Sequence, residues 1–112
     1  MISDLRLVLT TCRDREVADR LAGALVERRL AACVNVLPQV SSTYRWMGRI
    51  ERDDEVLVMI KTAETELETM EATIREISGY ELPELIAVDI SGGSAAYLAW
   101  VAESIGAKSP SV

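Results

Sequence analysis

The chain contains no histidine, and this absence removes the side chain that most often serves as a general base near neutral pH. A Ser-His-Asp triad is therefore excluded. The two cysteines, Cys12 and Cys33, form no Cys-x-x-Cys pair, so neither a disulfide framework nor a tetrahedral zinc site is expected. The phosphate-binding patterns GxGxxG and the Walker loop are also missing. We therefore predict no catalytic residues and a protein that is not an enzyme.

Basic charge and membrane-type segments are scarce as well. The chain has 18 acidic against 12 basic residues, a net charge of −6 and a pI near 4.6. Nucleic-acid binders need a basic face, which this balance argues against. Residues 1–6 do not lead into a long apolar stretch, so neither a signal peptide nor a membrane span is expected. We predict a cytoplasmic protein that binds neither nucleic acid nor membranes.

The apolar residues that are present form short periodic segments. Hydrophobic residues make up 49% of the 112 residues, with no phenylalanine, which suits one domain with an aliphatic core. Alternation and helical spacing predict strands at 5–11, 31–37, 56–62 and 85–90, and helices at 15–29 after an Asp14 cap, from about Thr65 to Gly79, and at 94–105. This order predicts an α+β fold, a ferredoxin-like βαββαβ sandwich with an added C-terminal helix, spanning 1–112 with a mobile tail at 106–112.

Residues 31–62 read as one long antiparallel hairpin with Gly48 near its middle. A chain of this length does not need so long a hairpin to close its own core, and overhanging strand edges normally find a partner. The segment 56–62 is apolar on both faces, yet two helices would cover only one face of the sheet. A second copy of the chain is the simplest cover for the other face, so we expect a homo-oligomer.

The sequence resembles the CutA family, small proteins named for tolerance to divalent cations. The resemblance runs from about Leu7 to Ile105 and is carried by five segments: AACVN at 31–35, Ser42-x-Tyr44-x-Trp46-x-Gly48, VMIKT from Val58, YELPEL from Tyr80, and Tyr97-Leu98-x-Trp100. It implies a ferredoxin-like homotrimer in which the hairpins extend the neighbours' sheets. It also implies a link to copper and other divalent cations, and an architecture similar to that of the PII signalling proteins.

The chain departs from the family where a metal would bind. Family members often have His-Pro-Tyr where this chain has Ser78-Gly79-Tyr80, and some carry a cysteine where it has Thr10. Cys12 lies two residues further on, on the same strand face if the strand continues that far. Copper and zinc prefer imidazole and thiolate, whereas carboxylates prefer harder cations. We predict at most weak binding of a divalent cation such as Cu²⁺, with Glu84 and Cys12 as candidate ligands.

Two further sets of residues are candidates for binding. By analogy with PII proteins, Lys61, Tyr80, Glu84 and Thr11 are expected to line a cleft for a small anionic metabolite between subunits. The alternative for Lys61 is an ordinary ion pair, for example with Glu84. A separate set of three aromatic residues is expected at the trimer interface, where such residues are enriched: Tyr44, Trp46 and Trp100.

A hydrolase of the acylphosphatase type is the third alternative, because those enzymes share the ferredoxin-like fold. Thr11 and Arg13 precede a helix N-terminus, which is a possible anion site. The phosphate-cradling loop of those enzymes is not found between the first strand and helix. Since fold alone says little about function, the non-enzymatic reading is preferred.

Overall fold

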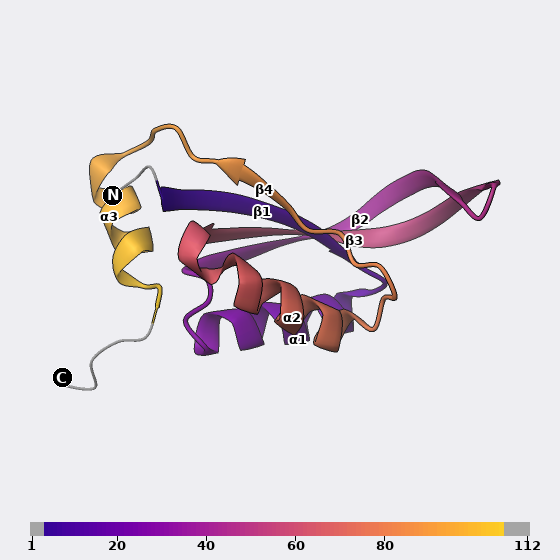
Figure 1. Cartoon of the computed structure of the whole chain (residues 1–112), viewed down its shortest axis with the longest axis horizontal. Helices are drawn as coiled ribbons and strands as arrows, with labels where there is room; N and C mark the ends of the chain where they lie inside the picture. The colour runs from indigo at the N-terminus through magenta and orange to yellow at the C-terminus, as the bar shows by residue number, and fades with distance from the viewer. Residues whose placement is uncertain (1–3, 107–112) are drawn as a thin grey trace.

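The computed structural model describes residues 4–106, and within them the chain forms one four-stranded sheet and three α-helices (Figure 1). The elements are β1 (Leu5–Cys12), α1 (Arg15–Glu27), β2 (Cys33–Trp46), β3 (Arg49–Ala63), the 3-10 turn η2 (Glu64–Glu66), α2 (Leu67–Ser78), β4 (Ile86–Asp89) and α3 (Ala95–Glu103). The strand order is β2-β3-β1-β4 and every pairing is antiparallel. The predicted fold class is confirmed. The predicted tail falls outside the described residues, except Gly106, whose N–H donates to the Arg29 carbonyl at 2.8 Å.

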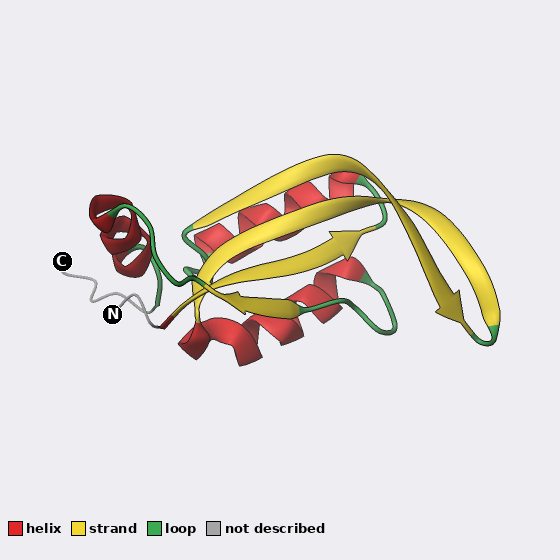
Figure 2. Cartoon of the chain, turned by 90° about the horizontal axis from the view of Figure 1, so that it is seen from above, coloured by secondary structure: helices red, strands yellow, loops and turns green. Residues whose placement is uncertain are grey.

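The two longer helices lie together on one face of the sheet (Figures 1 and 2). Their apolar stripes pack on the alternate residues of β1 and β3 that point toward them. This core is fully buried and consists of aliphatic side chains and Cys12: Val8, Cys12, Val17, Ala18, Leu21, Leu25, Val58, Ile60, Met70 and Ile74. Burial of such side chains is the main source of stability for the domain.

Local signals fix the ends of both helices. The Asp14 carboxylate accepts the N–H of Val17 at 2.8 Å and so caps α1, as predicted. Helix α2 begins later than the sequence suggests, because the 3-10 turn η2 precedes it. It ends at Gly79, whose φ of 73° is left-handed and favours glycine. The chain then turns sharply into the loop 79–85.

The long hairpin is confirmed, and its two strands are longer than expected. Strand β2 runs through Pro38 with a bulge between Leu37 and Val40, and β3 starts at Arg49 rather than near Val56. The polar residues 51–55 pair with β2 as strand although they lack an apolar face, since this part of the hairpin lies beyond the core. Figure 1 shows the hairpin extending past the rest of the sheet. Strand β3 lies between β2 and β1, which agrees with the apolar residues on both faces of the segment 56–62.

The other face of the sheet is largely uncovered. Helix α3 packs Leu98 and Val101 against Leu5 at one end of it. The rest, here called the helix-free face, presents half-buried or exposed apolar side chains: Leu7, Leu9, Leu37, Leu57, Met59, Ile86 and Val88. A continuous apolar surface of this kind on one sheet face is typical of an interaction surface.

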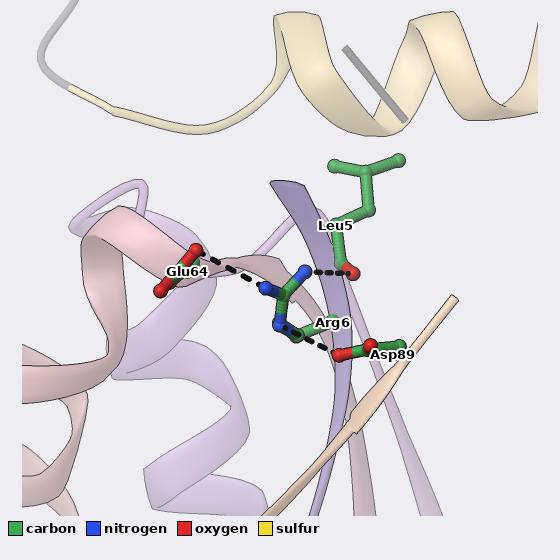
Figure 3. A network of polar contacts seen from close by, with 4 residues as sticks. All are labelled: Leu5, Arg6, Glu64 and Asp89. Carbon is green, nitrogen blue, oxygen red and sulfur yellow. Dashed lines mark hydrogen bonds and ion pairs between the residues drawn. The ribbon is translucent and has the colours of Figure 1, made fainter. Parts of the chain in front are cut away.

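Arg6 links three segments at the start of the sheet (Figure 3). Its guanidinium donates to the Leu5 carbonyl at 2.9 Å and forms ion pairs with Glu64 at 3.1 Å and Asp89 at 3.2 Å. The Arg6 side chain is only 15% exposed, although both carboxylates are largely in solvent. The contacts join the start of β1 to the turn after β3 and to the end of β4. They lie next to the end of the sheet that α3 covers.

Two buried threonines on the helix-covered face provide a matched stability test. The Thr10 hydroxyl finds no hydrogen-bond partner among the described residues, whereas the Thr62 hydroxyl donates to the Leu30 carbonyl at 2.6 Å. An unsatisfied buried hydroxyl is costly and a satisfied one stabilises. We expect Thr10→Val to raise the free energy of unfolding by about 1 kcal/mol and Thr62→Val to lower it by about 1 kcal/mol. Urea denaturation of both variants checks this, and effects of the same sign would contradict it.

Candidate functional site

A cavity of about 430 Å³ lies where the hairpin leaves the sheet, beside the loop 79–85. Its wall combines acidic and aromatic side chains with few others. The lining residues are Thr11, Tyr44, Arg45, Trp46, Asp53, Glu55, Tyr80, Glu81, Leu82 and Glu84. Four of them are acidic and one is basic, which leaves an excess of three negative charges when all are ionised. We refer to it as the hairpin cavity.

Strand pairing and alternation bring the strand residues to one side. Thr11 pairs with Leu57, so Glu55 and Asp53, which alternate with Leu57 along β3, lie on the same face as Thr11. On β2, Tyr44 and Trp46 share that face because they alternate with Ser42, the partner of Asp53. The loop 79–85 supplies the remaining wall after the left-handed turn at Gly79.

Two tyrosine hydroxyls hold two of the carboxylates in place. The Tyr80 hydroxyl donates to Glu55 at 2.7 Å, and the Tyr44 hydroxyl donates to Asp53. Burial and the hydrogen bond to Glu55 raise the pKa of Tyr80, and the bond to Asp53 raises the pKa of Tyr44 to about 12. Both phenols therefore stay protonated as donors near neutral pH, and the carboxylates remain the acceptors.

Glu84 completes the acidic part of the wall. Burial, and then the nearby charge of Glu55, raise the pKa of the Glu84 carboxyl. Burial makes the ionised form of Glu84 costly because it removes water, and the charge of Glu55 adds repulsion between two carboxylates. A cation placed in the hairpin cavity would reduce that cost, so the arrangement favours positively charged ligands over anions.

The residues predicted for the anion cleft are only partly brought together. Thr11, Tyr80 and Glu84 line the hairpin cavity, but Lys61 does not. The Lys61 ammonium lies 3.3 Å from the Tyr97 hydroxyl and 5.5 Å from the centre of that ring, near α3. Lys61 is thus next to neither Glu84 nor the cavity, and the suggested Lys61–Glu84 ion pair is replaced by a contact with Tyr97.

Sequence reasoning missed Asp53 and Glu55 as site residues. The strand predicted at 56–62 leaves residues 53–55 outside it, whereas in the structure they belong to β3. The signal that could have found them is the alternation of Asp53, Glu55 and Leu57, which continues the strand pattern in the N-terminal direction. Glu81 and Arg45 belong to the wall through the shape of the loop and of the twisted hairpin, for which the sequence gives no such signal.

The two residues predicted as metal ligands lie in different environments. Strand β1 extends to Cys12, which shares the buried, helix-covered face with Thr10 as expected. Burial, followed by the charges of Asp14 and Glu55, raises the pKa of the Cys12 thiol to about 11, so it is not a thiolate at neutral pH. Across residues 4–106, no three His, Cys, Asp or Glu side chains are grouped to hold a metal ion. The side chains present do not fit a thiolate or imidazole centre for copper or zinc.

The aromatic residues predicted for a trimer interface are all partly exposed in the single chain. Tyr44 is 39% exposed and Trp46 41%, and both also line the hairpin cavity. Trp100 on α3 is 46% exposed and packs against Tyr97 with ring centres 5.5 Å apart. Their burial between subunits stays a prediction. If Tyr44 and Trp46 do contact a neighbour, the hairpin cavity lies at a subunit boundary.

Comparisons with known proteins place the chain in one family. Residues 6–104 match the family described as CutA1 divalent ion tolerance protein. The divalent-cation tolerance protein CutA of Thermus thermophilus is 40% identical over 100 residues, which are 89% of this chain and 97% of that protein. Protein CutA of Mus musculus is 46% identical over 91 residues, or 81% of this chain; the chain spans about half the length of that relative.

Solved structures give the same answer. The structure of CutA1 from Oryza sativa has a TM-score of 0.90 and 35% identity, covering 96% of this chain and all of that one. Two relatives are named chloroplastic and one solved structure is described as periplasmic, so the cytoplasmic location stays a prediction. Among the described residues, no helix is long and apolar enough to cross a membrane. The match over nearly the whole chain confirms the resemblance, and the chain belongs to the CutA1 divalent-ion tolerance family.

Proposed function

We propose that the protein acts in divalent-cation tolerance as a non-enzymatic homotrimer that binds cations weakly in the hairpin cavity. The observation that carries the cation part is the acidic wall of the hairpin cavity, which Asp53, Glu55, Glu81 and Glu84 line. Because no three of these side chains are grouped closely enough to hold a metal ion in the single chain, only weak binding is expected. Relatives named for divalent-cation tolerance support the wider role.

The ligand chemistry favours weak binding of hard cations. Carboxylate oxygens are the natural ligands of Mg²⁺, Ca²⁺ and Mn²⁺, whereas tight Cu²⁺ sites use imidazole or thiolate. Glu84 is a direct candidate ligand because it lines the cavity. Cys12 is a poor one, because its thiol is buried in the core and protonated at neutral pH. Copper should therefore bind no more tightly than carboxylates alone allow.

Calorimetric titration with Cu²⁺, Zn²⁺ and Mn²⁺ tests this assignment. We expect dissociation constants of about 0.1 mM or weaker, as for open carboxylate sites. Glu84→Gln should weaken binding several-fold, and Cys12→Val should leave it unchanged. Micromolar Cu²⁺ binding that disappears in Cys12→Val would overturn the carboxylate assignment. Absence of any saturable binding would remove the metal role.

The homotrimer is supported by two surfaces of the single chain. The helix-free face is apolar and uncovered, and β2 forms an outer strand of the sheet whose hairpin extends beyond the core. Both are features that another copy of the chain would cover. The number of copies comes from the family resemblance.

The other two functions have less support. An anionic metabolite would face the acidic wall of the hairpin cavity, with Lys61 located elsewhere. For a hydrolase, Arg13 would have to bind the substrate phosphate. Its guanidinium instead donates to the Ser78 carbonyl at 3.0 Å and lies 3.8 Å from the Asp14 carboxylate. These contacts engage Arg13 in positioning the end of α2.

A further inference from the structure

We propose that the hairpin cavity binds a small aliphatic diamine, with its ammonium groups on Asp53 and Glu55 and its carbon chain against Tyr44, Trp46 and Tyr80. The inference rests on the same cavity as the proposed function, but it does not depend on metal binding. It names an organic cation as a ligand class for this site.

The first argument is size. A metal ion coordinated by carboxylates sits about 2.0–2.6 Å from each oxygen and needs only a small space. The hairpin cavity measures about 430 Å³, within the range of sites for small organic molecules. A bare ion would leave most of this volume to water, whereas an aliphatic amine would fill more of it.

The second argument is the composition of the wall. Tyr44, Trp46 and Tyr80 give the cavity three aromatic side chains that a hydrated metal ion would not use. Aromatic rings attract ammonium groups through the electrons of the ring face and pack well against methylene groups. The chain already makes such a contact elsewhere, where the Lys61 ammonium lies 5.5 Å from the centre of the Tyr97 ring. Acidic and aromatic side chains together therefore suit an alkylammonium ion.

The third argument is the spacing of the anchored carboxylates. Asp53 and Glu55 alternate on one face of β3, so their backbones are about 7 Å apart along the strand. Each carboxylate is held by a tyrosine hydroxyl, which leaves oxygen lone pairs for a further donor. A short diamine has two cationic ends joined by a chain that can span such a distance. A monoamine could satisfy only one of the two carboxylates.

Titration of the full chain with putrescine in the presence of EDTA tests the proposal by calorimetry. We expect saturable binding at one site per chain, and binding at least about tenfold weaker for butylamine because one charged hydrogen-bonded contact is lost. Glu55→Gln should weaken putrescine binding about tenfold for the same reason. Glu103→Gln on α3 makes the same charge change away from the cavity and should leave binding unchanged.

Trp46→Leu separates the aromatic contribution from the charge. It should also weaken putrescine binding, while retained far-UV circular dichroism and an unchanged mass by light scattering show that fold and assembly are intact. Equal binding by the native chain and Glu55→Gln, or no heat of binding at millimolar putrescine, would overturn the proposal. In the second case, Mn²⁺ binding that is sensitive to Glu84→Gln would leave the proposed function standing. Putrescine binding without metal binding would support the diamine site and remove the metal part of the proposed function.

Discussion

Replacing Met59 by aspartate should convert the proposed homotrimer into monomers. Met59 lies in the middle of the helix-free face, paired with Leu9 on one side and Asn35 on the other. Burying an unpaired carboxylate in an apolar interface costs several kcal/mol, which raises a dissociation constant by about a hundredfold or more. Light scattering coupled to size-exclusion chromatography measures the change in mass directly.

Met59→Leu is the matched control, because it keeps an apolar side chain of similar size and should remain assembled. The aspartate variant should still fold, since Met59 is only half-buried in the single chain and points away from the core that α1 and α2 form. If Met59→Asp remained trimeric, the helix-free face could not form the subunit interface, and the hairpin alone would have to form it. A monomeric native chain would remove the trimer from the proposed function.

Much of the fold could be predicted because its signals are local. The Asp14 cap, the αL glycine at the end of α2 and the apolar alternation of β1 each act within a few residues. The arrangement of two strand–helix–strand units then leaves few topologies. The uncovered face could also be predicted from the sequence. A strand such as β3 has apolar residues on both faces, and the two helices cover only one of them.

The site was harder to predict because it depends on long-range geometry. Thr11, Tyr80 and Glu84 line one cavity of the single chain, since the end of β1 meets the loop after α2, and their role in a cleft between subunits stays a prediction. Lys61 was placed with them, but β3 carries it several residues toward the opposite end of the sheet, next to Tyr97. Tyr44 lies near Asp53 because Ser42, two residues before Tyr44, is the pairing partner of Asp53, and this register is apparent only when residues 49–55 are recognised as strand.

The buried thiol of Cys12 should make the protein lose stability in mild alkali. Its pKa is raised in the folded chain from 9.0 to about 11, chiefly by burial. A folded-state pKa above the unfolded value gives stability that is fully present below pH 9 and lost as the pH rises toward 11. The loss should be on the order of 2 kcal/mol, from a shift of about two units at 1.36 kcal/mol each.

Cys12→Val isolates this effect, because valine keeps the site apolar and cannot ionise. The different packing of valine changes the free energy of unfolding by an amount that does not depend on pH. Tyr44 and Tyr80 titrate in both proteins, so their effect cancels in the difference. Plotted against pH, the difference between the two free energies of unfolding should be flat up to pH 9 and then shift toward the variant by on the order of 2 kcal/mol. Parallel curves would mean that the thiol ionises as easily when folded as when unfolded. Cys12 would then regain its place as a candidate ligand for soft cations, since the reason for excluding it is the cost of forming its thiolate in the core.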